Sequence, residues 1–251
     1  MTLKVNNISF SYNKDKQVLN EVSFQLEKAK TTCIMGISGS GKSTLLRIIA
    51  GFLSDEKKYF YSGNISFADK SIDSLRSNGK LSFMFQEPSL LPNLTVRENI
   101  SLPLRITKKF NDQQHIDNLI QSVGLKDSET KLPNALSGGM KTRTSLARSF
   151  ANLPDLLLLD EPFSALDIGW KNNLYNELAE LKSKYNTTVL LVSHDIEEAA
   201  KLSDVIVVLG SNGKLIRQVA ITGNEFEKRE IANSLRQDII SEHQKVIEAA
   251  K

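Results

Sequence analysis

Hydrophobic residues alternate with polar ones along the first part of the chain, as expected for β-strands. In residues 2–12 the apolar positions are Leu3, Val5, Ile8 and Phe10. A polar turn at 13–16 separates this run from a second, partly alternating run at 18–26. Because successive side chains of a strand point to opposite faces, each run predicts a strand with one buried face. Together they predict an antiparallel entry to the fold.

Several later runs rich in β-branched and apolar residues predict further strands, and the fully apolar run at 156–159 indicates a sheet covered on both faces, as in a parallel sheet between helices. These runs are residues 31–35, 81–86, 156–159 and 187–192, and the second of them ends on Gln86. The apolar segments 205–209 and 215–219 flank Ser211-Asn212-Gly213, which is a hairpin signal. Residues 54–80 mix short apolar pieces with turn residues and predict loop and short strand.

Helical spacing of apolar residues appears in three places. Leu45, Leu46, Ile48 and Ile49 precede a stop at Gly51, and residues 113–123 form an amphipathic pattern ended by Gly124. Residues 224–251 are charged and helical in pattern. The sequence thus predicts an α/β fold with a mostly parallel sheet, an antiparallel β subdomain and a helical insertion at about 87–150. We expect one domain over 1–223 and a C-terminal helical extension over 224–251.

Composition adds little to this picture. The 251 residues are 40% hydrophobic, which suffices for a sizeable core, and the net charge of +3 demands no nucleic acid partner. The single cysteine, Cys33, cannot form an internal disulfide. We find no run of about 18 apolar residues, so we expect no membrane-spanning helix.

The first candidate site is Gly36-Ile37-Ser38-Gly39-Ser40-Gly41-Lys42-Ser43-Thr44, which fits the phosphate-loop pattern G-x-x-x-x-G-K-S/T. Its glycines let the main chain approach an anion, and successive N–H groups form a concave nest for phosphate oxygens. The helix that follows adds the positive end of its dipole. Lys42 can reach the β- and γ-phosphates, and the Ser43 hydroxyl can bind Mg²⁺. The predicted strand–loop–helix context is the one this motif requires.

Two further elements carry charge chemistry. The buried strand at 156–159 delivers Asp160 and Glu161 at its carboxyl end, where ligands bind in open α/β sheets. Asp160 is placed to hold Mg²⁺ and Glu161 to orient or deprotonate an attacking water. Ser137, Gly138 and Gly139 precede an apolar-periodic run and predict a second anion-binding helix start. One triphosphate rarely needs two such sites in a single chain.

These motifs resemble those of the ATP-binding subunits of ATP-binding cassette (ABC) transporters. The phosphate loop, Gln86, residues 136–140, the acidic strand end, Ser164-Ala165-Leu166-Asp167 and Ser193-His194-Asp195 occur in family order. The resemblance spans about residues 2–220. It implies the phosphate-loop NTPase fold, with ATP and Mg²⁺ as ligands and ATP hydrolysis as the reaction.

The resemblance also implies a mechanism that one cassette cannot complete. Two cassettes pair head to tail, and Ser137, Gly138 and Gly139 of one contact the γ-phosphate held by the other. Asp167 would bridge the pair, and Gln86 would sense Mg²⁺ and the attacking water. His194 would hydrogen-bond the γ-phosphate. Tyr12 would stack on adenine, with Phe10 as the alternative.

The segment 86–96 is the surface expected to contact an integral membrane permease. Its sequence resembles the same stretch in the cassettes of importers of the nitrate, sulfonate and taurine group. Such systems use an extracytoplasmic solute-binding protein, which this chain would serve indirectly from the cytoplasmic face of the membrane. Two alternatives remain open. One is a cassette with a non-transport role, as in DNA repair or translation, and the other is a different phosphate-loop protein, such as a kinase or helicase-like ATPase.

Overall fold

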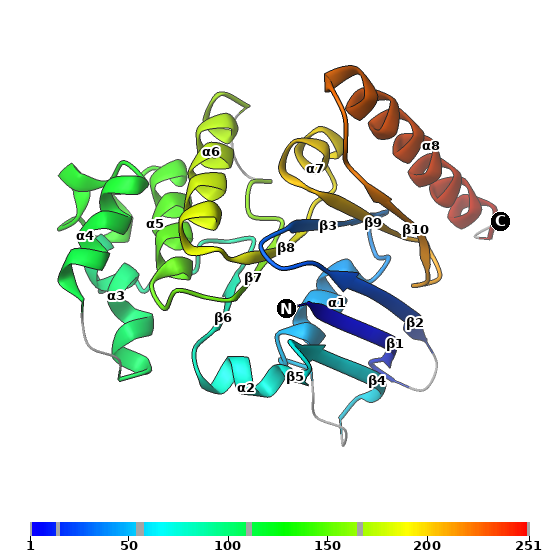
Figure 1. Ribbon diagram of the computed structural model, residues 1–251, viewed down its shortest axis with the longest axis horizontal. Coiled ribbons are helices and arrows are strands. Elements are labelled where there is room, and N and C mark those ends of the chain that lie inside the picture. The colour runs from blue at the N-terminus through cyan, green and yellow to red at the C-terminus, as the bar shows by residue number, and fades with distance from the viewer. Residues whose placement is uncertain (1, 14–15, 54–57, 109–111, 165–167, 250–251) are drawn as a thin grey trace. The chain divides into compact units, whose positions relative to one another are not determined.

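The computed structural model describes residues 2–13, 16–53, 58–108, 112–164 and 168–249. The chain forms two compact units. Unit 1 comprises Met1–Ser74 and Leu190–Lys251, and unit 2 comprises Leu75–Val189. Figure 1 labels the helices and strands of both units.

Unit 1 begins with the antiparallel sheet that the alternating pattern predicts. Its strand order is β2-β1-β4-β5. The bounds of these strands are β1 Leu3–Ser11, β2 Gln17–Leu26, β4 Phe60–Phe67 and β5 Lys70–Ser71. Leu3 pairs with Leu26 across β1 and β2, and both side chains are fully buried. One face of the sheet is therefore covered and the other is polar.

The second sheet of unit 1 carries the phosphate loop. Its strand order is β10-β9-β3, followed by the end of β8, and β3 and β9 are parallel. The strands are β3 Thr31–Gly36, β8 Thr188–Val192, β9 Val205–Leu209 and β10 Leu215–Ala220. Every residue of β3 is buried, including the two threonines at its start. The helices are α1 Lys42–Ile49, α7 Ile196–Leu202 and α8 Glu225–Ala249.

Unit 2 combines parallel strands with a helical region. Strands β6 Leu81–Met84 and β7 Leu156–Asp160 pair in parallel, and β8 begins next to β7. The helices are α3 Val96–Ile106, α4 Gln113–Ser122, α5 Gly138–Phe150 and α6 Ile168–Tyr185, with short 3₁₀ turns at Lys126–Ser128 and Pro133–Ala135. The core between α3, α4 and α5 contains the fully buried side chains of Ile100, Leu119 and Leu146. This α/β fold, mostly parallel with a separate antiparallel sheet, confirms the predicted fold class.

Two local predictions differ from the structure. Residues 54–80, predicted as loop and short strand, contain a helix, α2 Ile72–Ser77, in addition to β4 and β5. Strand β6 ends at Met84, so Gln86 follows the strand by two residues. The domain limits at 223 and around 87–150 remain predictions. Among the described residues, no helix is both long and apolar enough to cross a membrane.

Candidate nucleotide-binding site

The phosphate loop of unit 1 has the backbone geometry of an anion nest. Gly36, Gly39 and Gly41 have φ values of 149°, 80° and 95°, which are strained for residues with a side chain. A Cβ built on Gly39 would have nothing within 4 Å, so this part of the loop is open. The loop ends where α1 begins, and Leu45 N–H closes the first helical turn on the carbonyl of Gly41 at 2.8 Å. The N–H groups of the loop and the positive end of the α1 dipole thus both favour an anion at the same place, in the loop before α1.

Lys42 is buried, 6% exposed, and its ammonium group folds back over the loop. Its Nζ donates to the carbonyl of Gly36 at 3.0 Å and to that of Ile37 at 2.8 Å. A buried ammonium needs such acceptors, and phosphate oxygens in the nest can replace them. Of the other loop residues, Ser38 is exposed, Ser40 is buried, and Ser43 and Thr44 are half-buried.

Tyr12, which follows β1, is 45% exposed. Its hydroxyl lies 3.1 Å from the Thr44 hydroxyl, within hydrogen-bond distance. Phe10 and Tyr59 pack against the Tyr12 ring in edge-on contacts, with ring centroids 4.9 and 5.9 Å away. Phe10 is only 1% exposed, so Tyr12 is the better placed of the two predicted aromatics to receive a base.

His194 has an exposed side chain on a backbone that is fixed on both sides. The N–H of Ser193 donates to the carbonyl of Ile34 in β3 at 3.3 Å. Asp195 caps α7 by accepting from the N–H groups of Glu197 and Glu198 at 3.0 and 3.1 Å. His194 therefore follows β8 beside the strand that leads into the phosphate loop.

The acidic strand end of unit 2 holds two carboxylates in different surroundings. Asp160, the last residue of β7, is 5% exposed, whereas Glu161 is half-buried. Glu161 has φ of 47°, in the left-handed region that non-glycine residues rarely adopt. Such strain persists where the surrounding structure fixes the backbone, and it is common at functional sites.

Ser164 connects Gln86 to the backbone of Glu161. The side-chain amide of Gln86 donates to the Ser164 hydroxyl at 3.3 Å, and that hydroxyl donates to the carbonyl of Glu161 at 3.0 Å. Sequence reasoning did not assign this role to Ser164. Its spacing of three residues after Glu161 is the only local signal, because Gln86 lies 78 positions away in the chain.

The second predicted anion site is the start of α5. Ser137 is the N-cap residue, and its hydroxyl accepts from the N–H of Met140 at 3.3 Å. Cβ atoms built on Gly138 and Gly139 would have nothing within 4 Å. Thr142 follows on the same helix and donates to the carbonyl of Gly138 at 3.2 Å. This helix start is therefore open in unit 2. Asp167 lies outside the described residues.

The donor set for a metal ion is sparse. Across the residues that the structure describes, no group of three or more His, Cys, Asp or Glu side chains could hold a metal ion. Ser43 and Asp160 are the predicted protein ligands. Such a set fits Mg²⁺, which keeps several waters and usually binds proteins through one or two carboxylates together with substrate phosphates.

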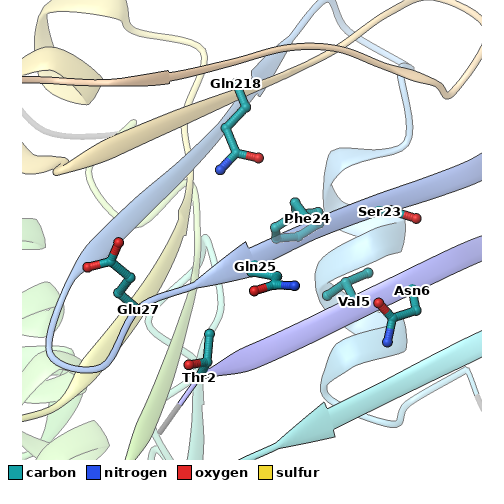
Figure 2. A pocket seen from close by; sticks show the side chains of 8 residues that line it. All are labelled: Thr2, Val5, Asn6, Ser23, Phe24, Gln25, Glu27 and Gln218. Carbon is teal, nitrogen blue, oxygen red and sulfur yellow. The ribbon is translucent and has the colours of Figure 1, made fainter.

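A hollow of about 540 Å³ on unit 1 lies apart from this chemistry. Figure 2 shows Gln25, Asn6, Ser23 and Gln218 around it, at the exposed end of β1 and β2 and beside β10. Its lining contains no residue of the phosphate loop. It therefore adds nothing to the nucleotide site.

The α/β fold and the open phosphate loop at the start of a helix are those of a phosphate-loop nucleotide-binding protein. The family model described as "ABC transporter" matches residues 19–164. The chain therefore belongs to the ATP-binding proteins of the ABC transporter family, binds ATP and is an ATPase.

Two curated relatives and one solved structure illustrate the match. An aliphatic sulfonates import ATP-binding protein, SsuB 1 of Pseudomonas savastanoi pv. phaseolicola, is 38% identical over 87% of this chain and 84% of its own length. A spermidine/putrescine import ATP-binding protein, PotA of Thermotoga maritima, is also 38% identical, over 86% of this chain and 57% of its own length. The dimeric structure of the ATP-binding cassette MJ0796, in a post-hydrolysis state bound to ADP and Pi, has a TM-score of 0.76. That cassette is 28% identical, and the match covers 88% of this chain and all of that one.

Proposed function

We propose that this chain is the ATP-hydrolysing subunit of an ABC importer and that it works as one of a pair of cassettes. The observation that carries the pairing is the presence of two helix starts with open glycines, one at the phosphate loop and one after Ser137. In a head-to-tail pair, the phosphate loop of one chain and the Ser137 helix start of the other chain contact the phosphates of the same nucleotide. The dimeric cassette among the solved relatives supports this arrangement.

Within this proposal each site residue has a role. Lys42 and the loop amides bind the phosphates, and Ser43 with Asp160 would hold Mg²⁺, which supplies charge stabilisation when bound. Glu161 takes the proton of the attacking water, and Gln86 and His194 orient that water and the γ-phosphate. The Gln86 side chain is linked to the backbone of Glu161 through Ser164, so a shift of Gln86 bears on the position of the Glu161 backbone.

Replacing Tyr12 by alanine is expected to raise the KM for ATP about tenfold with little change in kcat. Stacking of a base on an aromatic ring is worth about 1–3 kcal/mol. Tyr12→Phe is the matched control, because it keeps the ring and loses only the contact with Thr44. Inhibition by inorganic tripolyphosphate measures the phosphate site alone and is expected to stay constant. An unchanged KM for ATP in Tyr12→Ala would remove Tyr12 from base binding.

The proposed docking surface for a permease is a groove of about 400 Å³ in unit 2. Its walls come from β6, the segment after it, and helices α3 and α5. Apolar side chains line it and several are unusually exposed, namely Phe85 at 39%, Leu91 at 42% and Ile106 at 70%. Exposed apolar groups gathered in one place are typical of a protein interface.

Two polar side chains hold the rim of this groove in shape. Arg148 of α5 donates to the carbonyls of Pro88 and Ser89 at 2.8 and 3.0 Å. Asn99, fully buried in α3, accepts from the N–H of Leu91 and donates to carbonyls of the same loop, including that of Leu91. The segment between Gln86 and α3 is thus fastened at both ends. This supports transmission of a change at Gln86 into the docking surface and α5.

The test is co-purification from native membranes. We expect the tagged chain to bring down a multi-spanning integral membrane subunit, identified by mass spectrometry. Ile106→Asp places a charge in the groove and is expected to lower the recovery of that subunit at least tenfold. Leu132→Asp is the control, since Leu132 is similarly apolar and 40% exposed but does not line the groove. Recovery of only soluble proteins or nucleic acid would instead favour a non-transport cassette.

We further propose that the cargo is a small solute such as nitrate, a sulfonate, taurine or a related compound, received from an extracytoplasmic binding protein. The sulfonate-import relatives support this because the match covers 76–92% of their length, against 55–57% for the polyamine-import relatives. In this account the chain is peripheral to the cytoplasmic face of the membrane. A strain that lacks this chain is expected to lose sulfonate-dependent growth. A defect in polyamine uptake instead would contradict the proposed cargo.

A further inference from the structure

The C-terminal helix α8 places a buried carboxylate against the turn between β9 and β10. Glu242 is 4% exposed, and its Oε2 accepts from the N–H of Ser211 at 2.7 Å and from the Ser211 hydroxyl at 3.0 Å. Lys245 donates to the other carboxylate oxygen and, with these bonds from Ser211, holds the pKa of Glu242 below its usual range. Glu242 is therefore ionised at neutral pH and fastened to the turn.

The turn in question, residues 210–213, lies directly against the start of β2. The carbonyl of Gly213 accepts from the N–H of Asn20 at 3.0 Å. A Cβ on Gly213 would lie 2.1 Å from the carbonyl oxygen of Val18, so main chain meets main chain here. The turn can therefore not shift without moving β2.

The start of β2, which the turn contacts, and the end of β9, which leads into the turn, also touch the two ends of the phosphate loop. A Cβ on Gly41 would lie 2.7 Å from Leu19 Cδ2 and 3.0 Å from the carbonyl oxygen of Val18. A Cβ on Gly36 would lie 2.4 Å from the carbonyl oxygen of Leu209, the residue just before the turn. Close-packed contacts of this kind transmit small displacements.

We propose that Glu242 is a positioning residue for nucleotide binding, which acts by fixing the 210–213 turn behind both ends of the phosphate loop. This proposal rests on the phosphate loop being the ATP site. It assigns a role in the ATPase to α8, which follows β10 at the end of the chain (Figure 1). The affinity of the phosphate loop for nucleotide then depends on the packing of α8 against the 210–213 turn.

A second contact on α8 provides a matched control. Asp238 accepts from Arg217 Nη1 at 2.7 Å, and Ser234 accepts from the same nitrogen at 2.7 Å. These bonds tie α8 to β10 without touching the turn. Removing Asp238 weakens the docking of α8, whereas removing Glu242 also leaves the buried end of the turn without its acceptor.

The experiment measures KM and kcat for ATP hydrolysis by the full chain, together with its Tm. Glu242→Ala is expected to raise KM about fivefold to tenfold with kcat unchanged within about twofold. Glu242→Gln keeps an oxygen acceptor for Ser211 and is expected to recover most of the wild-type KM. Asp238→Ala and Glu242→Ala are expected to lower Tm by similar amounts. Asp238→Ala is nevertheless expected to leave KM within about twofold of wild type.

Hydrogen exchange of the amides in residues 36–43 gives a second readout that does not need turnover. We expect faster exchange there in Glu242→Ala but not in Asp238→Ala. Equal changes in both variants, or none in Glu242→Ala, would overturn the proposal. Lys42→Ala separates the proposed ATP site from the proposed role of Glu242. If Lys42→Ala abolishes ATP binding while Glu242→Ala does not alter KM, the phosphate loop is the ATP site but Glu242 does not position it.

Discussion

Replacing Glu161 by glutamine is expected to lower steady-state ATP hydrolysis by about a hundredfold or more, because a positioned general base contributes about 10²–10⁴ to such a reaction. Glutamine keeps the size of the side chain and one oxygen but cannot accept the proton. The backbone of Glu161 is held by Ser164, so the substitution leaves the strand end in place. ATP binding and pairing are expected to persist, and the variant accumulates as an ATP-bound dimer.

Two measurements check this prediction. A phosphate-release assay gives the rate, and light scattering with and without ATP gives the mass of the complex. Glu180→Gln is the control, since it removes one exposed carboxylate of unit 2 on α6 and is expected to leave the rate within about twofold. Undiminished hydrolysis by Glu161→Gln would remove Glu161 from the role of base.

Replacing Ser137 by arginine is expected to reduce hydrolysis about a hundredfold to a thousandfold while the isolated subunit keeps its ATP affinity. The bulky cation fills the open start of α5, where a Cβ on Gly138 or Gly139 would have nothing within 4 Å. Loss of preorganised donors at a developing charge has an effect of about this size. Because the proposed phosphate belongs to the partner cassette, binding to the subunit's own phosphate loop is not affected.

Mixing variants tests the same prediction from the other side. Lys42→Ala removes the phosphate-binding ammonium, and Ser137→Arg blocks the start of α5. A mixed pair retains one intact composite site, since each chain supplies the half that the other lacks. We expect the mixture to hydrolyse ATP faster than either variant alone. Loss of ATP affinity by Ser137→Arg as a monomer would show that its effect is not exerted across an interface.

The sequence predicted the parts of the site that depend on local structure. The phosphate loop follows a strand and opens a helix, and those elements are set by apolar runs and glycine positions near to it. Asp160 and Glu161 were predicted in the same way, as the end of a buried strand. The open helix start at Ser137 follows from an N-cap serine and two glycines.

The rest depends on residues far apart in the chain. The bond between Gln86 and Ser164 and the contact of Glu242 with Ser211 join separate elements, and neither has a local pattern that announces it. A charged helix such as α8 is expected to be solvated, so a buried carboxylate within it could not be anticipated. Helix α2 was missed because its six residues are too few for a helical period to be read.

The central claim is that hydrolysis requires two cassettes, and the dependence of the specific ATPase rate on protein concentration tests it most directly. The rate per chain of the purified wild-type protein is measured over a dilution series, with light scattering recording the mass at each point. The account predicts that the rate per chain falls toward zero as the protein becomes monomeric. A full and constant rate per chain in samples that are monomeric throughout would contradict it.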